Sequence, residues 1–160
     1  MTEQYSFEYE VYKSGDDLKP EDRILLQAAR EATANAYAPY SHFHVAAAAR
    51  LKNGEIIKGT NQENASYPVG TCAERVVLGS IGALFPNEPI GTMAITYHNM
   101  NGTSDTPASP CGMCRQALRE YEIRTQKPIR LILAGMEGKV FVIPQASMLL
   151  PLGFTSEDLK

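Results

Sequence analysis

The fold is best understood from one stretch of the chain, Cys72-Ala73-Glu74-Arg75-Val76-Val77-Leu78-Gly79-Ser80-Ile81-Gly82-Ala83-Leu84. Its side chains are mostly apolar and its two glycines allow close packing, which predicts a helix that is buried on most sides. Cys72 and Glu74 stand at the start of that helix. Because the start of a helix is the positive end of its dipole, it favours the ionised form of a thiol placed there. The sequence therefore predicts a core helix whose first turn carries reactive side chains.

The segments before this helix predict another helix and a β-hairpin. After Pro20, apolar residues recur at helical spacing, which predicts a helix over residues 20–36. Two apolar runs, residues 45–51 and 56–60, flank the pair Asn53-Gly54. Asn-Gly between two such runs is a strong hairpin signal, and this hairpin leads directly towards Cys72.

The segments after the helix predict three more strands and one more helix. Residues 93–97, 129–134 and 140–143 are short apolar runs typical of strands, and a helix is expected to begin close to Pro110. This alternation predicts an α/β fold: a three-layer α/β/α sandwich in which helices cover both faces of a central mixed sheet of about five strands.

The beginning of the chain resembles an addition to this arrangement. Apolar residues at positions 5, 7, 9 and 11 alternate with more polar neighbours, which predicts a half-buried strand at a sheet edge over residues 5–12. With 160 residues, 44% of them hydrophobic, the chain is long enough to build its own core. We therefore expect a single domain over residues 1–160, with residues 1–17 as an N-terminal extension.

Charge and segment composition narrow the classes of function. Fifteen Lys and Arg against eighteen Asp and Glu give a net charge of -3, which supplies no broad attraction for a phosphate backbone. A small-molecule substrate is therefore favoured over nucleic acid. Neither a signal peptide nor an apolar run of membrane-spanning length is present, and cysteines are few, so we expect a reducing, cytoplasmic location and no membrane partner.

The three cysteines of the chain occur in two short motifs that suit a zinc ion. Cys72 belongs to Cys-Ala-Glu-Arg, and Cys111 and Cys114 belong to Pro-Cys-Gly-Met-Cys. Structural zinc sites use four protein ligands, whereas catalytic sites use three and leave a position for water or substrate. The sequence therefore predicts one catalytic Zn²⁺ per chain, with Glu74 placed to take a proton from the bound water and deliver it to a leaving group.

Two arginines and three histidines are weaker candidates for a role at the metal site. Three thiolates bring excess negative charge to the ion, so a nearby cation is expected to hydrogen-bond the sulfurs, and Arg75 is a better candidate than Arg115. Arg115 is equally well explained as a surface residue paired with a carboxylate. The three histidines lack metal-ligand spacing and are interpreted as surface or packing residues: His42, His44 and His98.

Alone, each cysteine motif has an ordinary explanation. Cys-x-x-Cys in a cytosolic protein is as often a redox pair, and a lone buried cysteine is usually a packing residue. Together, the two motifs match the cysteine-ligand form of the zinc deaminase signature. A glutamate at a helix start often does no more than favour the dipole, but beside three candidate ligands a catalytic role for Glu74 is the stronger interpretation.

The chain resembles the small, tetrameric cytidine deaminases over nearly its whole length. Besides the cysteine motifs, the matching stretches are Tyr37-Ala38-Pro39-Tyr40-Ser41-His42-Phe43, Gly59-Thr60-Asn61-Gln62-Glu63-Asn64-Ala65-Ser66-Tyr67, Cys114-Arg115-Gln116 and Leu149-Leu150-Pro151-Leu152-Gly153-Phe154. The resemblance implies deamination of cytidine, and of 2'-deoxycytidine, to uridine and deoxyuridine in pyrimidine salvage. It also implies a homotetramer whose sites are completed by neighbouring chains.

The resemblance also implies roles for individual residues. Asn61 and Glu63 would hold the ribose hydroxyls, Ala65 would contact the base through its backbone, and Phe43 would pack on the nucleoside. Tyr67 and Phe154 would reach a neighbouring subunit. Ordinary explanations stay open for most of these. The Asn61 and Glu63 side chains suit a solvated loop, Phe43 and Tyr67 suit the chain's own core, and Phe154 suits a last short helix packed on its own domain.

Departures from the family pattern leave alternatives for the substrate. Residues 99–108 form a longer loop than the family pattern has, directly before Cys111, and can reshape the pocket. Another small cytosine nucleoside, such as a blasticidin-type antibiotic, is the nearest alternative substrate. A polynucleotide deaminase is disfavoured by the acidic charge and by the lack of a first-ligand histidine. A non-catalytic zinc-binding or thiol-redox module would need no Glu74.

Overall fold

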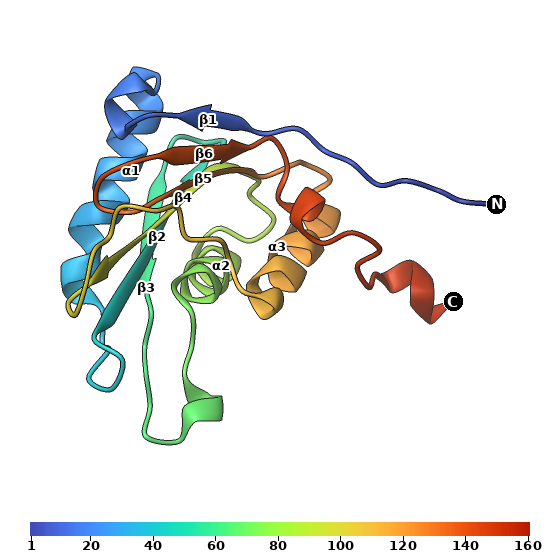
Figure 1. Ribbon diagram of the computed structural model, residues 1–160. Helices are drawn as coiled ribbons and strands as arrows, with labels where there is room; N and C mark the ends of the chain where they lie inside the picture. Colours follow the sequence, from blue (N-terminus) through green and yellow to red (C-terminus); the bar gives the residue numbers. More distant parts are fainter.

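A mixed six-stranded sheet runs through the computed structural model, which describes residues 1–160 (Figure 1). The strands are β1 (Glu10–Tyr12), β2 (Phe43–Leu51), β3 (Ile56–Thr60), β4 (Ile90–Asn99), β5 (Arg130–Ala134) and β6 (Val140–Ile143). Their order across the sheet is β1-β6-β5-β4-β2-β3. Only the β4–β5 pair is parallel, and the other neighbours are antiparallel. The long β2–β4 pair lies near the middle of the sheet and carries much of the site described below.

Helices cover both faces of this sheet, as predicted. One face packs against α1 (Pro20–Ala32), and the other packs against α2 (Ala73–Leu84) and α3 (Gly112–Thr125) (Figure 1). Short 3-10 turns complete the chain at Gly15–Asp17, Thr33–Asn35, Tyr67–Val69, Ala146–Leu149 and Ser156–Leu159. Two separate apolar cores, one under each helical layer, confirm the three-layer α/β/α prediction. None of the helices combines the length and apolar character needed to cross a membrane.

Helix α1 begins at residues that favour a helix start. Pro20 occupies its first turn together with Glu21 and Asp22, which favours a helix start. The α-helix ends at Ala32 and a 3-10 turn continues to Asn35, so the predicted helix over residues 20–36 contains both. Asp22 is buried and forms an ion pair of 2.8 Å with Arg130 on β5, which ties this helix to the middle of the sheet.

The N-terminal extension forms a shorter strand than predicted. Only Glu10–Tyr12 pairs with β6, whereas residues 5–9 run on as an extended arm. β6 is only four residues long, so its backbone offers no partner to the arm. Because β1 joins the sheet at its edge, the sheet has six strands instead of about five.

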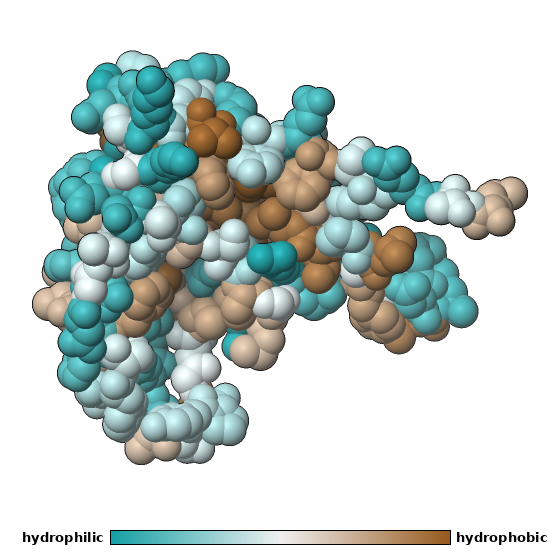
Figure 2. All heavy atoms as spheres, in the orientation of Figure 1, coloured by the Kyte–Doolittle hydropathy of each residue, from teal (hydrophilic) through white to brown (hydrophobic).

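Aromatic side chains line the arm. Tyr5, Phe7 and Tyr9 lie ring to ring, and Tyr9 meets Phe141 of β6 edge-on at 5.1 Å. The Tyr5 hydroxyl donates to the carbonyl oxygen of Met148 at 2.9 Å. In Figure 2 the surface over α1 is largely hydrophilic, and apolar atoms gather between the arm and the C-terminal segment.

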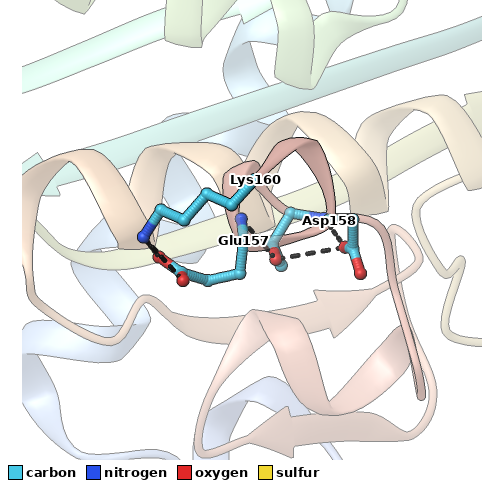
Figure 3. A network of polar contacts seen from close by, with 4 residues as sticks. Glu157, Asp158 and Lys160 are labelled. Carbon is cyan, nitrogen blue, oxygen red and sulfur yellow. Dashed lines mark hydrogen bonds and ion pairs between the residues drawn. The ribbon is translucent and has the colours of Figure 1, made fainter.

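The C-terminal part of the chain is anchored by a buried carboxylate. Glu122 of α3 is 6% exposed and accepts hydrogen bonds from the backbone N–H groups of Ile129, Ala146 and Ser147. These bonds connect α3 to the start of β5 and to the turn after β6. The last 3-10 turn lies at the surface, where Lys160 pairs with Glu157 and Asp158 caps the turn through the backbone N–H of Thr155 (Figure 3).

Candidate metal centre and substrate pocket

The three cysteine sulfurs lie close enough to share one ion. Cys72 is the N-cap of α2, Cys111 is the N-cap of α3, and Cys114 lies in the first turn of α3. All three sulfurs are within 4.8 Å of one another, with 3.8 Å between Cys72 and Cys111 and 3.5 Å between Cys111 and Cys114. Tetrahedral zinc with Zn–S bonds of about 2.3 Å separates its sulfurs by about 3.8 Å. The donor set therefore fits zinc, and no histidine or carboxylate joins the group.

The sulfurs differ in their surroundings, which affects their ionisation. Cys114 is fully buried, Cys72 is half-buried and Cys111 is exposed. A hydrogen bond from the Cys114 thiol lowers the pKa of Cys72, and the same contact together with burial raises the pKa of Cys114. Cys72 is thus the first of this pair to become the thiolate that a metal requires.

Glu74 stands in the first turn of α2, two residues after the first candidate ligand. It is 4% exposed, and burial raises the pKa of its carboxyl group. No cationic side chain forms an ion pair with it. A carboxyl group whose pKa is raised towards neutrality is suited to accept and return a proton during a reaction.

A cavity of about 200 Å³ opens beside the cysteines and Glu74. Its walls come from the start of β2, the end of β3, the start of α2, β4 and the loop before α3. The lining residues are Phe43, Val45, Asn61, Cys72, Ala73, Glu74, Ile95, Ala108, Ser109 and Cys111. The structure thus brings together five of the residues singled out from the sequence: Phe43, Asn61, Cys72, Glu74 and Cys111.

Asn61 fastens the start of β2 to the end of β3. Its side-chain oxygen accepts from the N–H of Val45 at 2.9 Å, and its side-chain nitrogen donates to the carbonyl of Phe43 at 2.9 Å. The amide is therefore held in one orientation at the pocket wall. One N–H and one lone pair of the amide are left for a ligand.

Glu63 lies in a second hollow of about 400 Å³, which is lined by Tyr40, Ser41, Glu63, Asn64, Tyr67 and Gly70. Its carboxylate accepts from the N–H of Tyr40 at 2.9 Å, from the N–H of Ser41 at 3.3 Å and from the Ser41 hydroxyl. These hydrogen bonds, led by the Ser41 hydroxyl, lower the pKa of Glu63. The carboxylate is thus oriented by the backbone, but it does not line the cysteine pocket itself.

Three further predicted residues lie apart from the cysteine pocket, and of these only Tyr67 lines the second hollow. Ala65 is exposed and lines neither hollow. Tyr67 is 77% exposed and its ring meets that of Tyr40, so the prediction that it packs in the chain's own core is wrong. It follows a loop that projects away from the sheet, where no core is available. Phe154 is 56% exposed, and only its backbone carbonyl is bonded, by Gln116.

The two arginines have different environments. Arg75 is exposed and makes no hydrogen bond to a sulfur, although its charge contributes to the lowered pKa of Cys72. Arg115 donates to the carbonyls of Pro110 and Leu149, at 2.8 and 2.9 Å. It therefore braces the turn before α3 against the C-terminal segment, and neither the sulfur contact nor the surface carboxylate pair considered for it is present.

Several wall residues carry no signal in the sequence. Val45 and Ile95 enter the pocket because β2 and β4 pair, and Ala108 and Ser109 enter it because of the path of their loop. Alternation along β2 places Val45 on the same face as Phe43 and is the only available clue. The sequence pattern places Tyr97, which stacks on Phe43, in a strand and does not connect it with the pocket.

The site combines three thiols at two helix starts with a buried carboxyl group and a small cavity. This combination is typical of catalytic zinc sites in α/β proteins. Residues 19–127 match the family model described as the cytidine and deoxycytidylate deaminase zinc-binding region. The chain belongs to this family of enzymes.

Individual relatives support the same assignment. The chain is 36% identical to a cytidine deaminase of Halalkalibacterium halodurans over 86% of this chain and 97% of that protein. The crystal structure of a cytidine deaminase from Burkholderia pseudomallei matches with a TM-score of 0.72 and 36% identity, covering 86% of this chain and 100% of the other. A blasticidin-S deaminase of Bacillus cereus is 31% identical over 87% of this chain and 96% of that protein.

Proposed function

We propose that the protein hydrolyses cytidine and 2'-deoxycytidine to uridine and deoxyuridine, with release of ammonia and with one Zn²⁺ per chain. The observation that carries the proposal is the position of Glu74, buried at the wall of the same cavity as Cys72 and Cys111. A non-catalytic zinc module or a redox pair has no use for a buried carboxyl group at that position.

The chemistry divides between the metal and the side chains. Zinc, when bound by Cys72, Cys111 and Cys114, supplies a Lewis acid that lowers the pKa of a coordinated water. Glu74 would take a proton from the attacking water and pass it to ring nitrogen N3 of the cytosine while the water oxygen forms a bond to C4. It would then carry the remaining hydroxyl proton to the exocyclic amino group, so that the C4–N bond breaks and ammonia leaves. The apolar walls Val45 and Ile95 limit the access of bulk water to the reacting atoms.

Substrate recognition is proposed to use both hollows. The cavity of about 200 Å³ takes the pyrimidine ring beside Phe43, and Asn61 and Glu63 bind the sugar hydroxyls. The fixed orientations of the Asn61 amide and the Glu63 carboxylate support this role, because they need little further ordering when a ligand binds. Ala65 is proposed to contact the base through its backbone, and Arg75 to reach the sulfurs from solvent.

Assembly and location follow from the same proposal. We infer a homotetramer in the cytoplasm, acting in pyrimidine salvage without a nucleic-acid or membrane partner. The aromatic residues Tyr67 and Phe154 support contacts with neighbouring subunits, since they are 77% and 56% exposed in the single chain. Light scattering coupled to size exclusion tests this, and an active monomer would contradict it.

A substrate panel tests the activity. Zinc-loaded protein is incubated separately with cytidine, deoxycytidine, cytosine, adenosine and blasticidin S, and ammonia release is followed. We expect release from the two cytosine nucleosides and little from free cytosine, because the sugar contacts are missing. Faster release from blasticidin S than from cytidine would favour the second candidate, which the Bacillus cereus relative supports. No release from any compound would leave a non-catalytic zinc protein.

A further inference from the structure

We propose that Tyr97 is a positioning residue that holds Phe43 in place as the aromatic wall of the substrate pocket. Phe43 lines the cavity with Glu74 and Cys111, whereas Tyr97 does not line it. The rings of Phe43 and Tyr97 are stacked, with centroids 4.6 Å apart and planes inclined by 16°. Tyr97 therefore supports the Phe43 ring from outside the cavity. This inference rests on the proposed function, because it concerns how that pocket binds a nucleoside.

The β-sheet register sets this stacking. Val45 of β2 lies directly opposite Tyr97 of β4, and Phe43 lies two residues before Val45, on the same face of the sheet. Phe43 and Tyr97 are therefore diagonal neighbours, which aromatic side chains can bridge across a sheet. Phe43 is the first residue of β2 and is not among the side chains packed on either apolar core, so stacking on Tyr97 is the contact that orients its ring.

The hydrogen bonds made by Phe43 restrain its backbone and not its ring. The Phe43 N–H donates to the Ser41 hydroxyl at 3.1 Å, and its carbonyl accepts from Asn61 at 2.9 Å. The backbone is thus fixed from both sides, but no such bond restrains the ring. Stacking on Tyr97 supplies that restraint.

Tyr97 is itself held firmly enough to act as a support. It is 6% exposed, and its hydroxyl hydrogen-bonds the hydroxyl of Thr106 at 3.2 Å. Thr106 belongs to the long loop that leads to Cys111. A wall that is rigid before the ligand arrives binds more tightly, because less side-chain freedom is lost on binding.

The test compares Tyr97→Leu with a matched control, Tyr121→Leu. Tyr121 of α3 is 5% exposed and its hydroxyl donates to the carbonyl of Glu88 at 2.8 Å, far along the helix from the cysteines. Tyr97→Leu is expected to raise KM for cytidine and Kd for uridine about two- to tenfold, the range of an aromatic pair, with kcat and zinc content little changed. Tyr121→Leu is expected to lower stability without moving either constant.

Two further variants separate positioning from general packing. Tyr97→Phe keeps the ring and loses only the bond to Thr106, so KM should stay within about twofold of the unsubstituted protein. In a Phe43→Leu background, Tyr97→Leu should have almost no further effect on KM, because Tyr97 acts through Phe43.

Three results would overturn the inference. They are equal KM values for Tyr97→Leu and Tyr121→Leu, a fall in kcat with KM unchanged, or additive effects of Phe43→Leu and Tyr97→Leu. Failure of the proposed function looks different, because the unsubstituted protein would then release no ammonia. Uridine binding still tests Tyr97 in that case, and absence of both turnover and binding would reject both proposals.

Discussion

At the scale of single residues, Glu74 is a buried carboxyl group without a cationic partner. It is 4% exposed and lacks an ion-pair partner, unlike Asp22, which pairs with Arg130, and Glu122, which accepts three backbone N–H bonds. Burial of a carboxyl group without an ion pair costs stability, and it raises the pKa of Glu74 although hydrogen bonds to its own backbone and to Cys114 oppose the rise. Sites that retain such a cost are often functional, which agrees with a proton-transfer role.

Replacing Glu74 by glutamine should therefore separate activity from stability. The amide keeps the shape but cannot shuttle a proton, so kcat for cytidine should fall by a factor of at least about 100. Zinc content should stay the same and the melting temperature should not fall, because an unfavourable buried carboxyl group is removed. Ammonia release, metal analysis and thermal unfolding measure the three quantities.

Glu120→Gln is the control, since Glu120 is an exposed carboxylate on α3 outside the pocket. It should leave all three quantities unchanged. Near-normal turnover in Glu74→Gln with zinc bound would contradict the proposed role.

At the scale of elements, the close approach of α2 to β3 places Cys72 and Glu74 at the pocket. A Cβ atom on Gly59 of β3 would lie 2.9 Å from a methyl of Val77 and 3.0 Å from the carbonyl oxygen of Ala73. Glycine is therefore required at this position for the helix to sit so near the sheet. A Cβ atom on Gly79, on the outer side of α2, would have no neighbour within 4 Å, so glycine is not required at that position.

This contrast predicts opposite effects for two glycine-to-alanine changes. Gly59→Ala should lower the free energy of unfolding by about 1–3 kcal/mol through overpacking, and should reduce turnover because the first turn of α2 shifts. Gly79→Ala should raise that free energy by up to about 1 kcal/mol, because alanine is the better helix former. Urea unfolding measures both. Equal effects of the two changes would show that the approach of α2 to β3 does not limit the fold.

At the scale of the whole molecule, the N-terminal extension lies well away from the pocket. β1 forms the edge of the sheet, and β6 and β5 separate it from β4 (Figure 1). It covers the outer edge of β6, whose Val140 and Val142 are at most 1% exposed. An uncovered strand edge is prone to pair with other chains. The extension therefore covers this edge and lines neither hollow of its own chain.

Deleting residues 2–12 should accordingly affect solubility and stability more than catalysis. Loss of the short β1–β6 pairing should cost about 1–3 kcal/mol of unfolding free energy, and light scattering should detect more self-association. Ammonia release per bound zinc should be retained. Deleting only residues 2–4, which precede the first packed aromatic residue, serves as the control and should change nothing. If the longer deletion lost turnover while it retained zinc, the arm would be required for activity.

Much of this molecule follows from local sequence, because helices, strands and the two cysteine motifs are encoded by spacing and composition. The strands at 45–51, 56–60 and 140–143 formed close to their predicted bounds, since each is an apolar run ended by turn residues. Three thiols and Glu74 could be assigned to one site because the two motifs are chemically specific together.

Tertiary structure alone decided which distant residues became neighbours. The stacking of Phe43 on Tyr97 depends on the β2–β4 register, which no short stretch of sequence encodes. The loop before Cys111 docks so tightly that a Cβ on Gly135 would lie 2.0 Å from the carbonyl oxygen of Ser104. The exposure of Tyr67 likewise depends on where its loop projects from the sheet. Local patterns fix periodicity and chemistry, whereas long-range packing determines which surfaces meet.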